Sequence, residues 1–418
     1  MSKRVYGTDY GKLLSDSHVK VDFAKLRRDR LERARAQMKK DGIGALLLFS
    51  HYNVRYVTGF RGPLYSRTAP RYYALLPRNG DPYLWGVGGH IHTFNDQMPW
   101  LKGNIRLSMG AVEWMIRDPE AYGGGFIKEV ADILAEHGIL NEPLGIDGPP
   151  SFSILKMADA CKKNGILNLA DGQSTMLEAR KIKTEEEIEL LEISAAIAES
   201  AFAEARDVIR PGITENELAG VLLKKLLTMG AEWVNDLVIC FGETTNPNRR
   251  AFGDRILRPG DMGMIDIAGS EFCGYRTCYY RTFTVGRASQ EQKDLYQSAY
   301  QMLYDGMSAV KAGNTTLDVV NKWPGPEHWG WDNEYIAYEN KMGHGIGLTQ
   351  HDPPMIITSI ARANPVVLEE DMVIALEVYE GKRGGKEGCK VEEEIVVTKD
   401  GYDLLTHWPV KEITECWI

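Results

Sequence analysis

The 418-residue chain lacks features that would place it in several common classes of protein. It has no basic tract, and its formal net charge of −9 argues against binding to the phosphate backbone of nucleic acids. No apolar run approaches the roughly 20 residues that span a bilayer, and the N-terminal 20 residues have no apolar segment typical of a secretory signal. The six scattered cysteines form no CxxC pair, which is typical of a reduced protein. We therefore expect a cytoplasmic protein that binds neither nucleic acid nor membrane.

The length of the chain indicates two globular domains, and the boundary is predicted between residues 177 and 178. The first part, 1–177, alternates helix and strand signals. A helical pattern in "KLRRDRLERARAQMKKDG" precedes the buried-strand run "IGALLLFS", and a hairpin is expected to turn at Asn79-Gly80. This alternation predicts an α/β domain.

The second part, residues 178–418, begins with two helix-start signals. Thr184 with Glu187, and Thr214 with Glu217, have the spacing of capping boxes. Strand patterns then follow in "DLVICFG", "MGMIDIAG", "RTFTVG", "MVIALEVYEG" and "KVEEEIVVT". Runs of strands with helices packed on one side predict an α+β domain.

Five positions in this second domain form a candidate metal site: Asp266, Cys278, His344, Glu377 and Glu392. Hard divalent metals prefer carboxylate oxygens with an occasional imidazole, which the His and the carboxylates supply. Burying several ionisable groups in strands is costly unless a cation or hydrogen bonds compensate them. The set therefore predicts a metal or acid–base site.

The motifs around these positions resemble a known superfamily. They are "RPGITENEL", "LRPGDMGMIDIAG", "GYRTCYYRTFTVG", "GHGIGLTQHDPP", "LEEDMVIALEVY" and "KVEEEIVVTKDGY". Residues 184–401 resemble the catalytic domain of the creatinase, aminopeptidase P and methionine aminopeptidase (M24) superfamily, and "LERARAQMKKDGIGALLLFSHYNVRYVTGF" resembles its N-terminal domain. The resemblance implies an α+β pita-bread catalytic domain preceded by a smaller α/β domain of the creatinase type. It also implies a homodimer.

The resemblance further implies which residues bind metal, and where the chain departs from the pattern. Metallopeptidases of this superfamily hold two ions with Asp, Asp, His, Glu and Glu, and four of these match Asp266, His344, Glu377 and Glu392. The second Asp, which bridges the ions, falls on Cys278, and the spacing from Asp266 is one residue longer, which requires a bulge or a register shift. The His upstream of the first Asp is missing, because no His occurs between His137 and His328.

Three interpretations of the metal site remain open from the sequence. The site binds no metal, as in creatinase, or it binds a single divalent ion through Cys278, His344, Glu377 and Glu392. For the single ion, zinc, iron and manganese are candidates, and a thiolate favours a softer metal such as zinc. In the third interpretation Cys278 is a small buried hydrophobic residue at a former ligand position.

The sequence-based prediction of function is a non-peptidase enzyme, a hydrolase or a lyase, that cleaves a C–N or C–S bond of a small polar or zwitterionic substrate. It depends on the missing bridging Asp and on a local resemblance of "TNP" and "GGKEGCKVEEEIVVTKDGYDLL" to the pita-bread dimethylsulfoniopropionate lyases. His351 is the predicted general acid or base, because its ordinary pKa lies near neutral pH. Glu377 is predicted to bind a metal or a cationic part of the substrate, and Tyr280 to donate a proton or a hydrogen bond.

Substrate-binding residues are predicted in two aromatic or basic segments. Trp331 and Tyr338 lie in an aromatic stretch just before His344 and have the chemistry to bind a cationic group. Arg61 can hold a carboxylate through two hydrogen bonds. Ordinary packing or a dimer contact for the aromatic residues, and a solvated loop for Arg61, are the favoured alternatives.

Two other functions compete with this prediction. One is an Xaa-Pro dipeptidase or aminopeptidase with a metal site, which the overall resemblance supports. The other is a non-catalytic protein that binds a small molecule on the same scaffold. The retained His344, His351, Glu377 and Glu392 argue against the loss of all catalysis.

Overall fold

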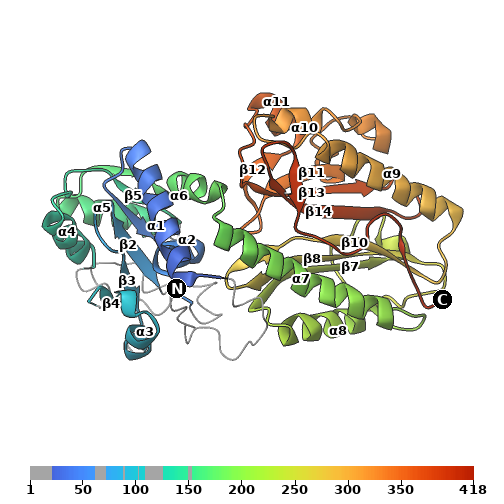
Figure 1. Cartoon of the computed structure of the whole chain (residues 1–418), viewed down its shortest axis with the longest axis horizontal. Helices are drawn as coiled ribbons and strands as arrows, with labels where there is room; N and C mark the ends of the chain where they lie inside the picture. Colours follow the sequence, from blue (N-terminus) through green and yellow to red (C-terminus); the bar gives the residue numbers. More distant parts are fainter. Residues whose placement is uncertain (1–20, 62–71, 88–89, 102, 109–125, 149–152) are drawn as a thin grey trace. The chain divides into compact units, whose positions relative to one another are not determined.

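The computed structural model describes residues 21–61, 72–87, 90–101, 103–108, 126–148 and 153–418 (Figure 1). The remaining residues, among them the N-terminal 20 discussed above as a possible signal segment, lie outside the described residues. The chain divides into two compact units, and the division follows Arg180. No helix among the described residues is both long and apolar enough to cross a bilayer.

The first unit is built around a mixed sheet. The described strands have the order β4-β3-β2-β1-β5-β6, and the predicted hairpin joins β2 to β3. Strand β1 is central and all four of its residues are buried, and Ala45 and Leu47 belong to a core that includes Leu75, Trp85 and Leu134. The strands are β1 Ala45–Leu48, β2 Tyr73–Pro77, β3 Tyr83–Gly86, β4 Ile105–Leu107, β5 Leu144–Ile146 and β6 Leu169–Asp171. The helices are α1 Phe23–Lys40, α2 His51–Thr58, α3 Ile91–Gln97, α4 Phe126–Glu136, α5 Ser153–Lys163 and α6 Gly172–Lys181.

The second unit contains two sheets, and all its residues are described. One sheet has the order β16-β10-β8-β7, with β9 paired to β8, and the other has the order β12-β11-β13-β14-β15. Helices α7 and α8 pack on the first sheet, and α9 packs on β13 and β14 of the second (Figure 1). Strands β10 and β14 lie against each other, so the two sheets meet along these strands. The predicted α+β class of this part is confirmed.

The elements of the second unit follow from local signals in the sequence. The side chains of Thr184 and Thr214 accept hydrogen bonds from the backbone N–H groups of Glu187 and Glu217, so both predicted capping boxes are confirmed. The helices are α7 Glu185–Val208, α8 Glu215–Thr228, α9 Gln290–Met307, α10 Thr316–Val320 and α11 Thr358–Ala363. The strands are β7 Trp233–Phe241, β8 Met262–Phe272, β9 Tyr275–Thr277, β10 Tyr280–Val285, β11 Lys341–Gly345, β12 Asp352–Ile356, β13 Val373–Glu380, β14 Cys389–Val397, β15 Tyr402–Leu404 and β16 Thr414–Cys416.

A bulge in β8 explains the extra residue between Asp266 and Cys278. Asp266 pairs with Tyr280 and Ser270 pairs with Thr277, so four steps along β8 lie opposite three steps of the partner chain. Gly269 lies in this stretch with a φ of +77°, a conformation that glycine adopts without steric cost. Cys278 follows directly after β9, at the break before β10.

Candidate active site and metal centre

The acidic and imidazole groups of the site lie on one face of the second sheet. Glu377 of β13 pairs with Glu392 of β14, and His344 of β11 pairs with Ala375, two residues before Glu377. Because side chains two residues apart point to the same face of a strand, His344, Glu377 and Glu392 all face the same side. Antiparallel pairing of three neighbouring strands therefore brings together residues that are up to 48 positions apart in the sequence.

Cys278 completes a cluster with His344 and Glu392. One potential ligand atom from each residue lies within 4.8 Å of the others, and all three residues are buried. This spacing suits ligands on different sides of one ion, because zinc–ligand bonds are about 2.0–2.3 Å long. The Cys278 sulfur accepts a hydrogen bond of 3.5 Å from Gln350. Burial and the nearby Glu392, Asp266 and Glu377 raise the pKa of the Cys278 thiol, so the thiol keeps its proton unless a cation replaces it.

Glu392 is the most unusual member of this cluster. Its side chain is fully buried, and within residues 181–418 neither carboxylate oxygen has a hydrogen-bond partner. Burial, followed by the charges of Glu377 and Asp266, raises the pKa of Glu392 well above its ordinary value. A buried carboxylate without donors is costly, and a bound cation would remove that cost.

His344 presents a free ring nitrogen to the same place. Its Nδ1 lies 3.0 Å from the carbonyl oxygen of Gly345, which can only accept, so Nδ1 carries the proton and Nε2 has a lone pair. Nε2 is buried, has no hydrogen-bond partner among the described residues and lies 4.0 Å from Glu392 Oε1. Burial and the neighbouring His351 lower the pKa of His344 to about 4, so the imidazole is neutral at neutral pH.

Glu377 has a different partner from the other predicted ligands. The ammonium group of Lys390, itself almost fully buried, lies 2.7 Å from Glu377 Oε2. Burial alone would raise the pKa of Glu377, but Lys390 and His344 hold it below its ordinary value. Burial raises the pKa of nearby Asp266 to about 7, with Lys390 acting in the opposite direction and Glu377 in the same direction as burial. Lys390 is not among the residues predicted from the sequence, although its place two residues before Glu392 in a strand puts both side chains on one face.

The remaining acidic residues of β14 support the site. Glu394 Oε1 accepts hydrogen bonds from the Thr277 hydroxyl at 2.9 Å and from the Cys278 backbone N–H at 2.5 Å. Glu394 therefore fixes the chain where the thiol enters the cluster. Glu393 points to the opposite face and forms a buried ion pair of 2.8 Å with Arg281 of β10.

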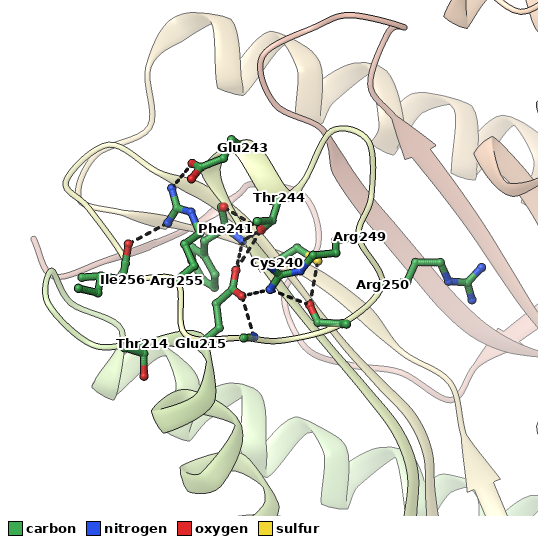
Figure 2. A network of polar contacts seen from close by, with 12 residues as sticks. Thr214, Glu215, Cys240, Phe241, Glu243, Thr244, Arg249, Arg250, Arg255 and Ile256 are labelled. Carbon is green, nitrogen blue, oxygen red and sulfur yellow. Dashed lines mark hydrogen bonds and ion pairs between the residues drawn. The ribbon is translucent and has the colours of Figure 1, made fainter.

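A loop anchored by Glu215 carries a further basic residue to the site. Glu215, buried in the first turn of α8, accepts hydrogen bonds from Phe241 N–H, the Thr244 hydroxyl and Gly253 N–H, and it pairs with Arg249. Figure 2 shows Arg249 directed at Glu215 and Arg250 extending away from it. These divergent directions accompany a φ of +55° at Arg250, which is unusual for a residue with a side chain.

Arg250 is half-exposed and faces the site. Its guanidinium lies 2.6 Å from Glu339, and the charges of Tyr280, Glu377 and Asp266 act on it. Tyr338 donates a 2.7 Å hydrogen bond to the same Glu339. Arg250 lies in the segment "CFGETTNPNRRAFGDR", where the peptidase pattern has its upstream His. The missing His was therefore the sequence signal that could have pointed to Arg250.

The other predicted site residues have different surroundings. His351 is exposed, and its ring centroid lies 4.3 Å from that of His344. Tyr280 is buried with the Lys390 ammonium 4.2 Å from its ring centroid. Trp331 packs against the core of the second unit, with Arg383 over its ring, and Arg61 belongs to the first unit. Substrate binding by Trp331 and Arg61 stays a prediction.

The fold and the site together define an enzyme with a creatinase-type N-terminal domain and a pita-bread catalytic domain. A model of metallopeptidase family M24 matches residues 189–399, and a model of the creatinase/prolidase N-terminal domain matches residues 30–182. The chain therefore belongs to metallopeptidase family M24. The predicted pita-bread fold is confirmed.

Comparisons with individual proteins point to peptidases. The chain is 25% identical over 390 residues to the uncharacterized peptidase YqhT of Bacillus subtilis, covering 91% of this chain and 98% of YqhT. It is 29% identical over 270 residues to an Xaa-Pro dipeptidase of Pyrococcus furiosus, covering 63% of this chain and 74% of that protein. The solved structure of an Xaa-Pro dipeptidase from Bacillus anthracis matches with a TM-score of 0.73 and 24% identity, covering 93% of this chain and 99% of that one.

These relatives correct the predicted function. The prediction of a non-peptidase enzyme that cleaves a C–N or C–S bond was wrong, because the relatives are peptidases and favour the rival prediction. The resemblance to dimethylsulfoniopropionate lyases receives no support from them. The error came from treating the replacement of the bridging Asp by Cys278 as evidence against a peptidase, although a thiolate also binds metal and Cys278 lies beside His344 and Glu392.

Proposed function

We propose that the chain is a metal-dependent dipeptidase that cleaves dipeptides of the Xaa-Pro class. The observation that carries the proposal is the buried Glu392 carboxylate, whose two oxygens have no hydrogen-bond partner in the fully described second unit, beside the free Nε2 of His344. A cation would satisfy this pair, the chain belongs to a metallopeptidase family, and one of the relatives named above is an Xaa-Pro dipeptidase.

Cys278, His344 and Glu392 would hold the metal. A sulfur, an imidazole nitrogen and a carboxylate oxygen together favour zinc, or iron, over manganese. When bound, such an ion polarises the scissile carbonyl and makes a water molecule more acidic. The Nδ1–H···O=C bond from His344 to Gly345 orients the imidazole for this role.

His351 and Tyr280 would handle protons and hydrogen bonds. Partial burial lowers the pKa of His351, with Glu377 acting against it and Arg250 and Lys390 acting with it, so the imidazole is neutral at neutral pH and could accept a proton from the attacking water. The same group can return that proton to the departing amine. Burial and the nearby carboxylates raise the pKa of Tyr280 well above its ordinary value, so its hydroxyl remains a donor.

Arg250 would bind the terminal carboxylate of the dipeptide. It is the half-exposed guanidinium that faces the site, and its partner Glu339 is also surface-accessible. A guanidinium can hold a carboxylate through two parallel hydrogen bonds. Tyr338 donates a hydrogen bond to Glu339 of this ion pair, so it would lie at the rim of such a binding region.

The proposal is tested by hydrolysis of Xaa-Pro dipeptides before and after removal of metal. We expect chelation to abolish hydrolysis and stoichiometric zinc to restore it, whereas Glu392→Gln abolishes both the activity and tight zinc binding. The exposed Glu370 of the same domain provides a matched control, since Glu370→Gln makes the same chemical change outside the site. Absence of hydrolysis by the zinc-loaded protein, or full activity of Glu392→Gln, would contradict the proposal.

The homodimer stays a prediction. A homodimer would have twice the chain mass of 46.9 kDa in solution. Light scattering coupled to size-exclusion chromatography measures this mass directly.

A further inference from the structure

The side chain of Gln350 contacts the sulfur of Cys278, one of the three proposed metal ligands. Its Nε2 donates a hydrogen bond to Sγ at 3.5 Å. The other end of the same amide is also occupied, because Gln350 Oε1 accepts a 3.3 Å hydrogen bond from the side chain of Asn235. With its oxygen turned to Asn235, the amide presents its N–H group to the sulfur.

The segment that carries Gln350 is fixed beside Cys278 by backbone hydrogen bonds. The N–H of Arg276 in β9, two residues before Cys278, donates a 2.9 Å hydrogen bond to the carbonyl oxygen of Gly347. The N–H of Gly347 donates in turn to the carbonyl oxygen of Thr349 at 3.1 Å, which closes a turn just before Gln350. The turn is therefore held on the strand that leads into the metal cluster.

The bulge in β8 leaves room for this contact. Asn235 of β7 lies opposite Gly269, because the residues on either side of Asn235 pair with those on either side of Gly269. A Cβ atom at position 269 would lie 2.6 Å from Asn235 Cβ and 3.4 Å from Gln350 Oε1, and the first distance is shorter than real Cβ contacts allow. The extra residue between Asp266 and Cys278 therefore coincides with the place where Asn235 reaches Gln350.

An amide has the right chemistry to support a sulfur ligand. Residues that hydrogen-bond to a metal ligand fix its orientation, and losing them typically costs about 10- to 100-fold in metal affinity. An N–H donor stabilises the negative charge on a sulfur that binds metal, and a neutral amide does so without adding a charge of its own. A carboxylate at position 350 would instead place a further negative group beside Cys278 and Glu392.

We propose that Gln350 is a positioning residue for the Cys278 ligand. Its amide, held in place by Asn235, orients the sulfur toward the cluster and strengthens metal binding through that sulfur. This inference rests on the proposed function, because it concerns the same metal centre. It goes beyond the proposed function by assigning the residues that allow a cysteine to serve as a ligand in this chain.

The experiment compares metal binding by Gln350→Met and by the wild type. Methionine has a similar length but no N–H donor. Competition with a chromogenic chelator measures zinc affinity, which we expect to fall by roughly 10- to 100-fold. In the cobalt-loaded protein, the near-ultraviolet sulfur-to-cobalt charge-transfer band should shift to longer wavelength or lose intensity, because the sulfur has lost its donor. Gln301→Met makes the same change at an exposed position of α9 and should behave as the wild type.

A second background separates a contact with the sulfur from a general effect on the turn. In Cys278→Ala the amide has no sulfur to contact, so adding Gln350→Met should cause no further loss of zinc affinity. Asn235→Ala, at an exposed position, should lower zinc affinity less than Gln350→Met, because the donor remains but loses its support. An equal loss from Gln350→Met in both backgrounds would overturn the inference.

The outcomes also separate this inference from the proposed function. Suppose that the wild type binds zinc and hydrolyses Xaa-Pro dipeptides, and that folded Gln350→Met has unchanged zinc affinity and an unchanged cobalt band. This result would overturn the inference alone. A wild type that binds zinc through sulfur but hydrolyses no dipeptide would overturn the proposed function, whereas a changed cobalt band in Gln350→Met would still support the inference. A wild type that binds no zinc would overturn both.

Discussion

Two adjacent arginines, Arg249 and Arg250, have different partners and different proposed roles. Arg249 pairs with the buried Glu215, which also accepts hydrogen bonds from Phe241, Thr244 and Gly253 (Figure 2). Arg250 turns away from this network and carries its charge toward the site. The first arginine therefore anchors the loop, and the second is the residue proposed to bind the carboxylate of the substrate.

Removal of the Arg250 side chain should weaken substrate binding more than turnover. Arg250→Ala is expected to raise KM for an Xaa-Pro dipeptide by roughly 10- to 100-fold with little change in kcat, because hydrogen bonds to charged groups contribute about 1.5–3 kcal/mol. Steady-state kinetics measure both constants. The matched substrate is the Xaa-Pro amide, which lacks the carboxylate and should be hydrolysed equally by both proteins. An equal loss on the dipeptide and on its amide would contradict the assignment.

The site residues that the sequence predicted stand in recognisable local patterns, whereas the residues that it missed are charged residues of types that usually lie in solvent. His344, Glu377 and Glu392 stand in recognisable strand and turn patterns, so the sequence predicted them as neighbours. Lys390 and Arg250 were missed because a lysine or an arginine near acidic residues usually lies in solvent. Only tertiary structure reveals that one is buried and that the other has a left-handed backbone.

At the scale of secondary-structure elements, a buried ion pair joins the two sheets of the catalytic domain. Arg281 of β10 and Glu393 of β14 are each 1% exposed, and their side chains meet at 2.8 Å. Arg281 also donates hydrogen bonds to the carbonyl oxygens of Tyr280 and Trp408. The pair lies on the face of β14 opposite Glu392, so it positions the strand that carries the site.

Breaking this pair from one side should destabilise the fold strongly. Glu393→Gln is expected to lower the free energy of unfolding by about 3–5 kcal/mol, because it leaves a buried guanidinium without its counter-charge. Denaturant unfolding measures the change. The double variant Arg281→Met/Glu393→Leu should lose less, since it buries no unpaired charge. The exposed pair Arg206–Asp207 is the control, and Asp207→Asn should have little effect. Unchanged unfolding of Glu393→Gln would show that the pair does not hold the sheets together.

The elements were more predictable than their registers. Capping signals located the starts of α7 and α8, because a Thr and a Glu three residues apart satisfy free backbone groups locally. The extra residue between Asp266 and Cys278 predicted a bulge or a register shift. Its place at Gly269 could not be predicted, because strand pairing depends on the partner chain and on the neighbouring strand.

At the scale of the whole molecule, the family and fold followed from motifs spread over both domains, whereas the reaction did not. The departure at Cys278 directed the prediction away from peptidases. In the structure, the bulge, Glu394 and Gln350 hold the Cys278 thiol within reach of His344 and Glu392, so the thiol is a candidate metal ligand. A changed ligand therefore indicates a changed metal site more directly than a changed reaction.

The most direct test of this account is a crystal structure of the zinc-loaded protein with anomalous diffraction data collected on both sides of the zinc absorption edge. The account predicts an anomalous zinc peak in the catalytic domain, bound by Cys278 Sγ, His344 Nε2 and a Glu392 oxygen. A peak elsewhere, with the Glu392 carboxylate still unpaired, would contradict the metal centre itself.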